Sequence, residues 1–166
     1  SISACGSAYL TGHVGKYILE EYARLPVDIE LASEYRYKTN IPDKNSALLA
    51  VTQSGETADT LAAVRMAKEL GIPAYGMVNV VGSTIARETD AGMYNHAGPE
   101  IAVASTKVVI SQLVSFVLLT LLIGREKGMT QEEGIEIVEG LRDLPNVIAQ
   151  MLKNTEQIEK YANKYK

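Results

Sequence analysis

The feature that most constrains the fold is an alternation of short apolar runs with longer amphipathic segments. Residues 46–51, 74–78 and 91–94 are short apolar runs of the kind that forms buried strands. Between them, residues 57–70 repeat apolar side chains at helical spacing, and 83–88 forms a shorter intervening segment. Strands that alternate with helices in this way predict an α/β fold with a doubly wound parallel sheet.

The first thirty residues add two strands and a helix to this pattern. Residues 2–4 have the character of a strand end, and residues 27–31 alternate with period two, as an edge strand does. A helix is predicted over residues 9–24 by an apolar stripe made of Leu10, Val14, Tyr17, Ile18 and Tyr22. The chain as a whole therefore predicts a three-layer αβα domain with five parallel strands in flavodoxin-like order.

Composition excludes several classes of protein. The 166 residues are 46% hydrophobic and 22% charged, values typical of an ordered globular domain rather than a disordered or fibrous chain. A net charge of −4 argues against nucleic acid as a partner. A single cysteine forms neither an internal disulfide nor a metal framework, so we expect a cytoplasmic protein without a bound metal. The start at Ser1, without Met or a signal peptide, predicts a piece of a longer chain.

The most apolar stretch, residues 108–123, is shorter than a membrane span requires and carries polar side chains such as Gln112. We expect a helix buried against the sheet or against a partner, and no membrane.

The chain after residue 128 differs from the rest. Thr130 and Glu133 fit a capping box, and Pro145 suits the first turn of a further helix. The predicted organisation is an α/β domain at 1–128 and a helical segment at 129–166, whose last residues form a solvated helix or a linker.

Candidate binding residues follow the first and third predicted strands, at the switch point where an open parallel sheet binds ligands. Cys5-Gly6-Ser7 follows one strand, and residues 52–57 follow the other, with hydroxyls on Thr52, Ser54 and Thr57. Each loop opens a helix, and a helix N-terminus suits a phosphate. Gly55 would let the backbone approach that anion. A single such loop is explained by helix capping alone, but two loops at one switch point favour a phosphate site.

A third loop, residues 95–100, leads toward Ser105, which is predicted to cap the following helix, either in that role alone or while also facing the same crevice. Lys107 is expected to be solvated rather than bound to phosphate. Cys5 stands where a nucleophile could stand, but a packing role is favoured. Neither His13 nor His96 has a second metal ligand at suitable spacing. No Walker lysine and no Gly-x-Gly-x-x-Gly is present, so we expect no nucleotide cofactor.

Three segments in order, residues 30–37, 52–60 and 96–107, resemble the first sugar-isomerase (SIS) subdomain of the glucosamine-6-phosphate synthase family. Residues 79–83 and 85–88 fit the same pattern. The family's fold is a five-stranded parallel sheet flanked by helices. The resemblance implies that the chain binds fructose 6-phosphate or glucosamine 6-phosphate, in an enzyme that makes glucosamine 6-phosphate and glutamate from fructose 6-phosphate and glutamine.

The resemblance also implies which residues contact the sugar phosphate. The implied substrate-binding residues are Ser7, Thr52, Gln53, Ser54, Thr57, Val103 and Ser105. The family's proton-transferring residues belong to a second SIS subdomain and its cysteine nucleophile to a glutaminase domain, so no catalytic residue is expected here. Those two domains, and a second copy in a homodimer, are the implied partners. The alternatives are a SIS module that senses a sugar phosphate and regulates a partner, and a fructosamine-phosphate deglycase.

Overall fold

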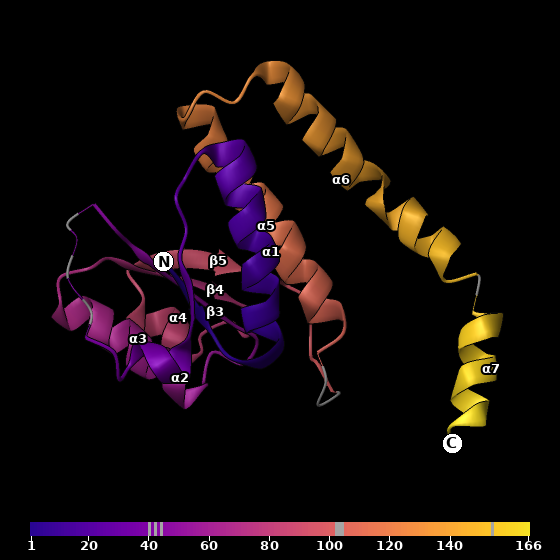
Figure 1. Cartoon of the computed structure of the whole chain (residues 1–166), viewed down its shortest axis with the longest axis horizontal. Helices are drawn as coiled ribbons and strands as arrows, with labels where there is room; N and C mark the ends of the chain where they lie inside the picture. Colours follow the sequence, from indigo (N-terminus) through magenta and orange to yellow (C-terminus); the bar gives the residue numbers. More distant parts are fainter. Residues whose placement is uncertain (40, 42, 44, 102–104, 154) are drawn as a thin grey trace. The chain divides into compact units, whose positions relative to one another are not determined.

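The structure, a computed structural model, describes residues 1–39, 41, 43, 45–101, 105–153 and 155–166 (Figure 1). The chain divides into two compact units, Ser1–Gly128 and Met129–Lys166. The first unit contains the sheet together with five helices, and the second unit consists of two helices.

Five parallel strands form the sheet of the first unit. They are β1 (Ile2–Ala4), β2 (Ile29–Leu31), β3 (Leu48–Thr52), β4 (Ala74–Val78) and β5 (Ala91–Tyr94). The strands lie in the order β2-β1-β3-β4-β5, and every neighbouring pair is parallel. This is the flavodoxin-like order, so the predicted fold class is confirmed. The order reverses direction between β1 and β3, which pair directly through the register Ala4 to Val51.

Helices cover both faces of the sheet. One face carries α1 (Gly6–Ala23) and α5 (Lys107–Glu126), and the other carries α2 (Ala32–Tyr35), α3 (Ala58–Glu69) and α4 (Thr84–Glu88). Strand β3 shows how the sequence separates the two cores, because successive side chains of a strand point to opposite faces. Leu48 and Ala50 pack with α2, α3 and α4, whereas Val51 packs with α1 and α5.

The predicted first helix is confirmed, but the apolar stripe that predicted it lies on the outside. Leu10 and Tyr17 are 65% and 70% exposed, and Val14 and Tyr22 are also exposed. The buried face of α1 is instead made of smaller side chains, namely Thr11, Gly12, Gly15, Leu19 and Ala23. Small residues bury less apolar area, but they allow a neighbouring helix to approach closely.

That neighbour is α5, which lies side by side with α1 (Figure 1). The contact is so close that a Cβ atom added to Gly15 would lie 2.4 Å from a ring carbon of Phe116. Phe116 is fully buried at this point. One helical turn earlier on each helix, Thr11 meets Gln112 through a side-chain hydrogen bond.

Helix α5 is the one described helix whose length and apolar composition would suffice to cross a membrane. Its buried face nevertheless includes polar residues: Gln112, Ser115 and Thr120 are all buried. Ser115 accepts a hydrogen bond from the Asn95 amide at 2.8 Å, which ties α5 to the end of β5. Exposed apolar side chains, among them Leu118 and Leu122, lie elsewhere on the helix. The helix thus packs on its own domain through a mixed face, in which these polar residues lie beside the fully buried Val108 and Phe116.

The second unit contains α6 (Gln131–Met151) and α7 (Glu156–Lys164). The predicted capping box is confirmed, because Thr130 and Glu133 exchange both of its hydrogen bonds. The prediction for Pro145 is wrong: this residue lies inside α6 rather than in the first turn of a further helix. A proline inside a helix removes one backbone hydrogen bond, and here the residues on both sides continue the helix.

Candidate functional site

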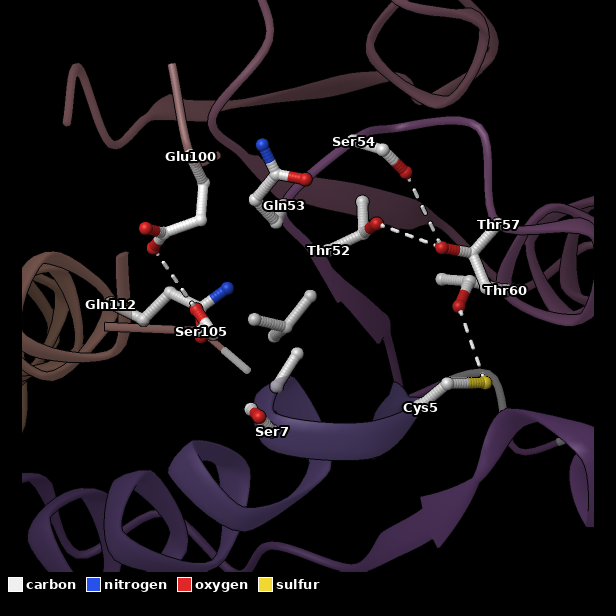
Figure 2. A pocket seen from close by; sticks show the side chains of 12 residues that line it. Cys5, Ser7, Thr52, Gln53, Ser54, Thr57, Thr60, Glu100, Ser105 and Gln112 are labelled. Carbon is white, nitrogen blue, oxygen red and sulfur yellow. Dashed lines mark hydrogen bonds between the residues drawn. The ribbon is translucent and has the colours of Figure 1, made fainter. Parts of the chain in front are cut away.

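A pocket of about 200 Å³ opens at the switch point between β1 and β3 (Figure 2). The loop after β1, the loop after β3 and the segment that leads into α5 all contribute to its wall. Three helices, α1, α3 and α5, therefore begin close to one cavity. The lining residues are Cys5, Ser7, Ala8, Val51, Thr52, Gln53, Ser54, Thr57, Thr60, Glu100, Ser105 and Gln112.

The loop after β3 is organised by its own hydroxyl groups. Thr57 Oγ1 lies 3.3 Å from Thr52 Oγ1 and 3.5 Å from Ser54 Oγ, so three hydroxyls gather at the start of α3. The backbone N–H of Gly55 donates to Thr52 Oγ1, and that of Glu56 donates to Ser54 Oγ. Thr57 is the residue before the helix, yet its side chain makes no capping hydrogen bond. The hydroxyls thus shape the loop, and the N-terminus of α3 is left without a side-chain cap.

Gly55 is required by the packing of this same loop. Its φ of +67° lies in the left-handed region that favours glycine. A Cβ atom at this position would lie 1.9 Å from Ser83 Oγ and 2.9 Å from a methyl carbon of Val78. The space that a side chain would need is therefore already occupied by Ser83 of the loop after β4 and by Val78, so any other residue would force this loop or its neighbours to shift.

The start of α5 is built differently, because a carboxylate from the preceding loop occupies it. Glu100 Oε2 accepts hydrogen bonds from the backbone N–H groups of Thr106 at 2.9 Å and of Val108 at 3.2 Å. Glu100 Oε1 accepts from the Thr106 hydroxyl, and Ser105 Oγ donates to Oε2 at 3.4 Å. The prediction that Ser105 caps this helix is wrong, since Glu100 performs that role. Glu100 precedes the helix, so its side chain can accept hydrogen bonds from the N–H groups that the first helical turn leaves without a backbone partner.

The hydrogen bonds from Thr106 lower the pKa of the Glu100 carboxyl, with further contributions from Val108 N–H and the nearby positive charge of Lys107. Hydrogen bonds to the charged form of an acid always act in this direction. Glu100 is therefore an anion at neutral pH. It places a negative charge beside the pocket at the α5 end.

Asn79 holds the loop that carries Glu100. Its amide nitrogen donates to the carbonyl oxygen of Gly98 at 2.8 Å, and its amide oxygen accepts from the N–H of Ala97 at 2.8 Å. The Asn79 side chain is almost fully buried. Since both ends of the amide are used, the loop is fixed to the end of β4 at two points.

The predicted site residues are placed consistently around this pocket. Ser7, Thr52, Gln53, Ser54, Thr57 and Ser105 all line it, and Val103 lies outside the described residues. Lys107 is exposed, as expected. Cys5 takes the favoured packing role, since it packs against the core on the α3 side. It also lines the pocket, where its sulfur accepts from the Thr60 hydroxyl at 3.8 Å.

Sequence reasoning missed Glu100, Gln112 and Thr60 as pocket residues. Glu100 was read as part of a loop, and Gln112 only as a polar residue in an apolar helix. A signal for Gln112 was available, since Gln112, Ser115 and Thr120 recur at helical spacing within an otherwise apolar stretch. Such a polar stripe on a buried helix marks the face that meets a site or a polar core.

The pocket is suited to binding rather than to proton transfer. Cys5 and Glu100 are its only titratable lining residues among those that the structure describes. The Glu100 pKa is lowered, which makes it a weaker base. Within the described parts of the chain, no group of three or more His, Cys, Asp or Glu side chains is arranged to hold a metal ion. What the arrangement offers is hydroxyls and N–H groups for an anion, with a carboxylate and an amide on the opposite side.

Fold and pocket together define a doubly wound α/β domain with a hydroxyl-rich pocket at its switch point. Residues 1–122 match the model of the SIS domain, and the chain belongs to that family. It is 48% identical over 164 residues to a glutamine–fructose-6-phosphate aminotransferase (isomerizing) of Clostridium tetani, and 44% identical over 165 residues to that of Chlorobaculum tepidum. These alignments include 98% and 99% of this chain, which spans 27% of each relative's length.

A solved structure shows the same arrangement. The C-terminal domain of glucosamine-fructose-6-phosphate aminotransferase from Francisella tularensis superimposes with a TM-score of 0.93 at 36% sequence identity. The superposition covers 96% of this chain and 46% of that one. The similarity therefore extends beyond the SIS domain into the helices that follow it, and more than half of the solved chain has no counterpart here.

Proposed function

We propose that this chain binds a hexose phosphate, with the phosphate group at the start of α3 and the sugar toward the start of α5. One observation carries the proposal: of the three helix N-termini at the pocket, the α3 end gathers three hydroxyls, whereas the α5 end is already occupied by a carboxylate. A phosphate is attracted to free N–H groups and to the positive end of a helix. It is repelled by Glu100, so the α3 end is the one that suits it.

The proposed contacts are those expected from the sequence. Thr52, Ser54 and Thr57 supply hydroxyls at the α3 end, where Gln53 adds an amide. Ser7 and Ser105 lie toward the rest of the pocket and are assigned to the sugar, together with Val103. A net charge of −4 does not oppose this assignment, because N–H and hydroxyl donors hold a phosphate without a lysine.

The proposed substrate is fructose 6-phosphate, with glucosamine 6-phosphate as product, in a protein that acts as a glutamine–fructose-6-phosphate aminotransferase. The names of the relatives and of the solved structure support this. In that reaction glutamine supplies the nitrogen and becomes glutamate. We propose that this chain binds the sugar phosphate but does not catalyse the reaction alone, since its described pocket lacks a poised acid–base pair.

The remaining parts of the proposal concern partners. A second SIS subdomain and a glutaminase domain would complete the enzyme, with residues 129–166 leading toward that second subdomain. We also propose a homodimer in the cytoplasm. The length of the relatives supports the existence of further domains, since this chain spans 27% of them.

The test is a titration of the chain with fructose 6-phosphate and glucosamine 6-phosphate, followed by NMR of backbone amides. Signals of Ser7 and of residues 52–57 should shift, and unchanged signals throughout both loops would contradict the proposal. Ser54→Ala should weaken binding by about 1–3 kcal/mol, the range for a hydrogen bond to a charged group. Ser46→Ala is the matched control, since Ser46 precedes β3 and is absent from the pocket lining.

A further inference from the structure

Gln112 is a buried polar side chain that faces the pocket and has no role in the site as described so far. It lies on α5 and is 1% exposed. Its amide oxygen accepts a hydrogen bond from Thr11 Oγ1 at 2.9 Å. The same hydroxyl lies 2.8 Å from the carbonyl oxygen of Ala8, and its single proton is shared between the two oxygen atoms in a three-centre hydrogen bond that links α1 and α5. The Gln112 amide is therefore held at one end by a residue that does not line the pocket.

The other end of the amide points into the cavity. Figure 2 shows the Gln112 nitrogen directed toward the open space between Ser7 and Gln53. Among the residues that the structure describes, this nitrogen has no hydrogen-bond partner. An amide nitrogen is a donor only. Because this nitrogen is directed into the cavity, its natural complement is an oxygen atom of a bound molecule.

The position of Gln112 indicates which part of the molecule that oxygen belongs to. Ser54 and Thr57 lie on the far side of the pocket, whereas Glu100 and Ser105 lie on the same side as Gln112 (Figure 2). Glu100 keeps a phosphate away from this side. The partner of Gln112 is thus a hydroxyl or carbonyl oxygen on the sugar carbons remote from the phosphate.

We propose that Gln112 is a specificity-determining residue that donates a hydrogen bond to a sugar oxygen, and that Thr11 positions it. This inference rests on the proposed function and deepens it. The pocket would then measure the ligand at two separate points, one for the phosphate and one for the sugar. A site that contains a buried donor discriminates strongly against a ligand lacking the matching oxygen.

The test compares fructose 6-phosphate with inorganic phosphate as probes on the 166-residue chain. Gln112→Met preserves the length and packing of the side chain but removes the donor. It should weaken fructose 6-phosphate about 5-fold to 10-fold, the loss of one neutral hydrogen bond, while inorganic phosphate binds unchanged. An equal loss for both probes, or no loss for either, overturns the inference. A chain that binds neither probe before substitution overturns the proposed function, and the inference with it.

The positioning role of Thr11 has its own readout. Thr11→Val removes the hydroxyl and should lower the affinity for fructose 6-phosphate while leaving that for inorganic phosphate. Thr11→Ser restores the hydroxyl and should restore the affinity. If Thr11→Ser melts at the temperature of the unchanged chain but does not restore the affinity for fructose 6-phosphate, the hydrogen bond to Gln112 has no part in sugar recognition.

Discussion

The N-termini of α3 and α5 face the same pocket but differ in the side chains that surround them. At α3, three hydroxyls gather around the loop and no side chain caps the helix. At α5, the Glu100 carboxylate accepts hydrogen bonds from the backbone N–H groups of Thr106 and Val108 and from the Thr106 hydroxyl. One helix end is left available to an anion, and the other holds an anion of its own.

This difference gives the pocket a direction. Two equal anion sites at one cavity would bind a phosphate in either of two orientations. With Glu100 in place, the negative end of a ligand is restricted to α3, and neutral polar groups are left for the α5 side. A single carboxylate in a loop can therefore orient a ligand that it repels.

The sharpest way to break the comparison is to give α3 a carboxylate as well. Ser54→Asp places a negative charge where the phosphate is proposed to bind. Like charges in contact cost several kcal/mol, so affinity for fructose 6-phosphate should fall about 100-fold or more. Isothermal titration measures the loss, and Ser54→Asn is the uncharged control, expected to lose far less. Equal losses for the two variants would show that charge does not set the orientation.

A second prediction compares the glycines of the two loops. Gly55→Ala combines a left-handed φ with a clash against Ser83, and should destabilise the domain by about 2–4 kcal/mol. Gly98 in the loop toward α5 also has a positive φ, of +73°, but a Cβ atom there would meet only the Lys107 ammonium at 3.9 Å, an ordinary contact. Gly98→Ala should therefore cost only about 1 kcal/mol. Urea denaturation of both variants checks the difference, and similar costs would contradict the packing role of Gly55.

Asn79 offers a way to loosen one side of the pocket alone. Asn79→Ala removes both hydrogen bonds to Ala97 and Gly98 and should cost about 1–3 kcal/mol. Amide exchange should accelerate at Ala97 and Thr106, while Gly55 and Glu56 keep their protection. Asn45→Ala, at an exposed position, is the matched control. A uniform acceleration in both loops would mean that the two sides are not independent.

The smallest expected effect is the response of the α5 start to acid. The folded-state pKa of Glu100 is lowered, so its contribution to stability is complete above the ordinary glutamate pKa and is lost as the pH falls through the lowered value. Below about pH 4, exchange at the Thr106 and Val108 amides should therefore accelerate. In Glu100→Gln this dependence on pH should disappear. A dependence that survives the substitution would assign it to another group.

Much of the fold could be predicted because strand and helix patterns are local. The strands at 74–78 and 91–94 agree with the predicted bounds. Burial explains the first, since β4 is buried except at Tyr75. The expectation of a buried strand is wrong for 91–94, because β5 lies at the edge of the sheet and is mostly exposed. The orientation of α1 could not be predicted in this way. A stripe of large apolar residues such as Leu10 and Tyr17 favours burial, but the helix turns its small residues inward to meet α5. The sequence alone favours burial of the face with the large apolar residues, whereas packing against α5 buries the face with the small ones.

The site was predictable to the extent that it follows strand ends. Hydroxyl residues after β1 and β3 could be located from the sequence, because the ends of neighbouring parallel strands lie together. Glu100 and Gln112 could not. Glu100 lies in the loop that leads into α5, but six positions before Thr106, which is farther from the helix than a usual capping residue. Gln112 depends on a partner 101 positions away, which only the folded domain brings close.

The close approach of α1 and α5 links the interior of the domain to the ligand. Gly15 and Phe116 lie one turn beyond Thr11 and Gln112, so the bulk allowed at residue 15 sets the gap across which the Thr11–Gln112 hydrogen bond must form. Gly15 thus sets the distance between α1 and α5 at this point. On the proposed function, Gly15→Ala would displace Phe116, widen this gap and weaken sugar binding, without changing any residue assigned to the sugar.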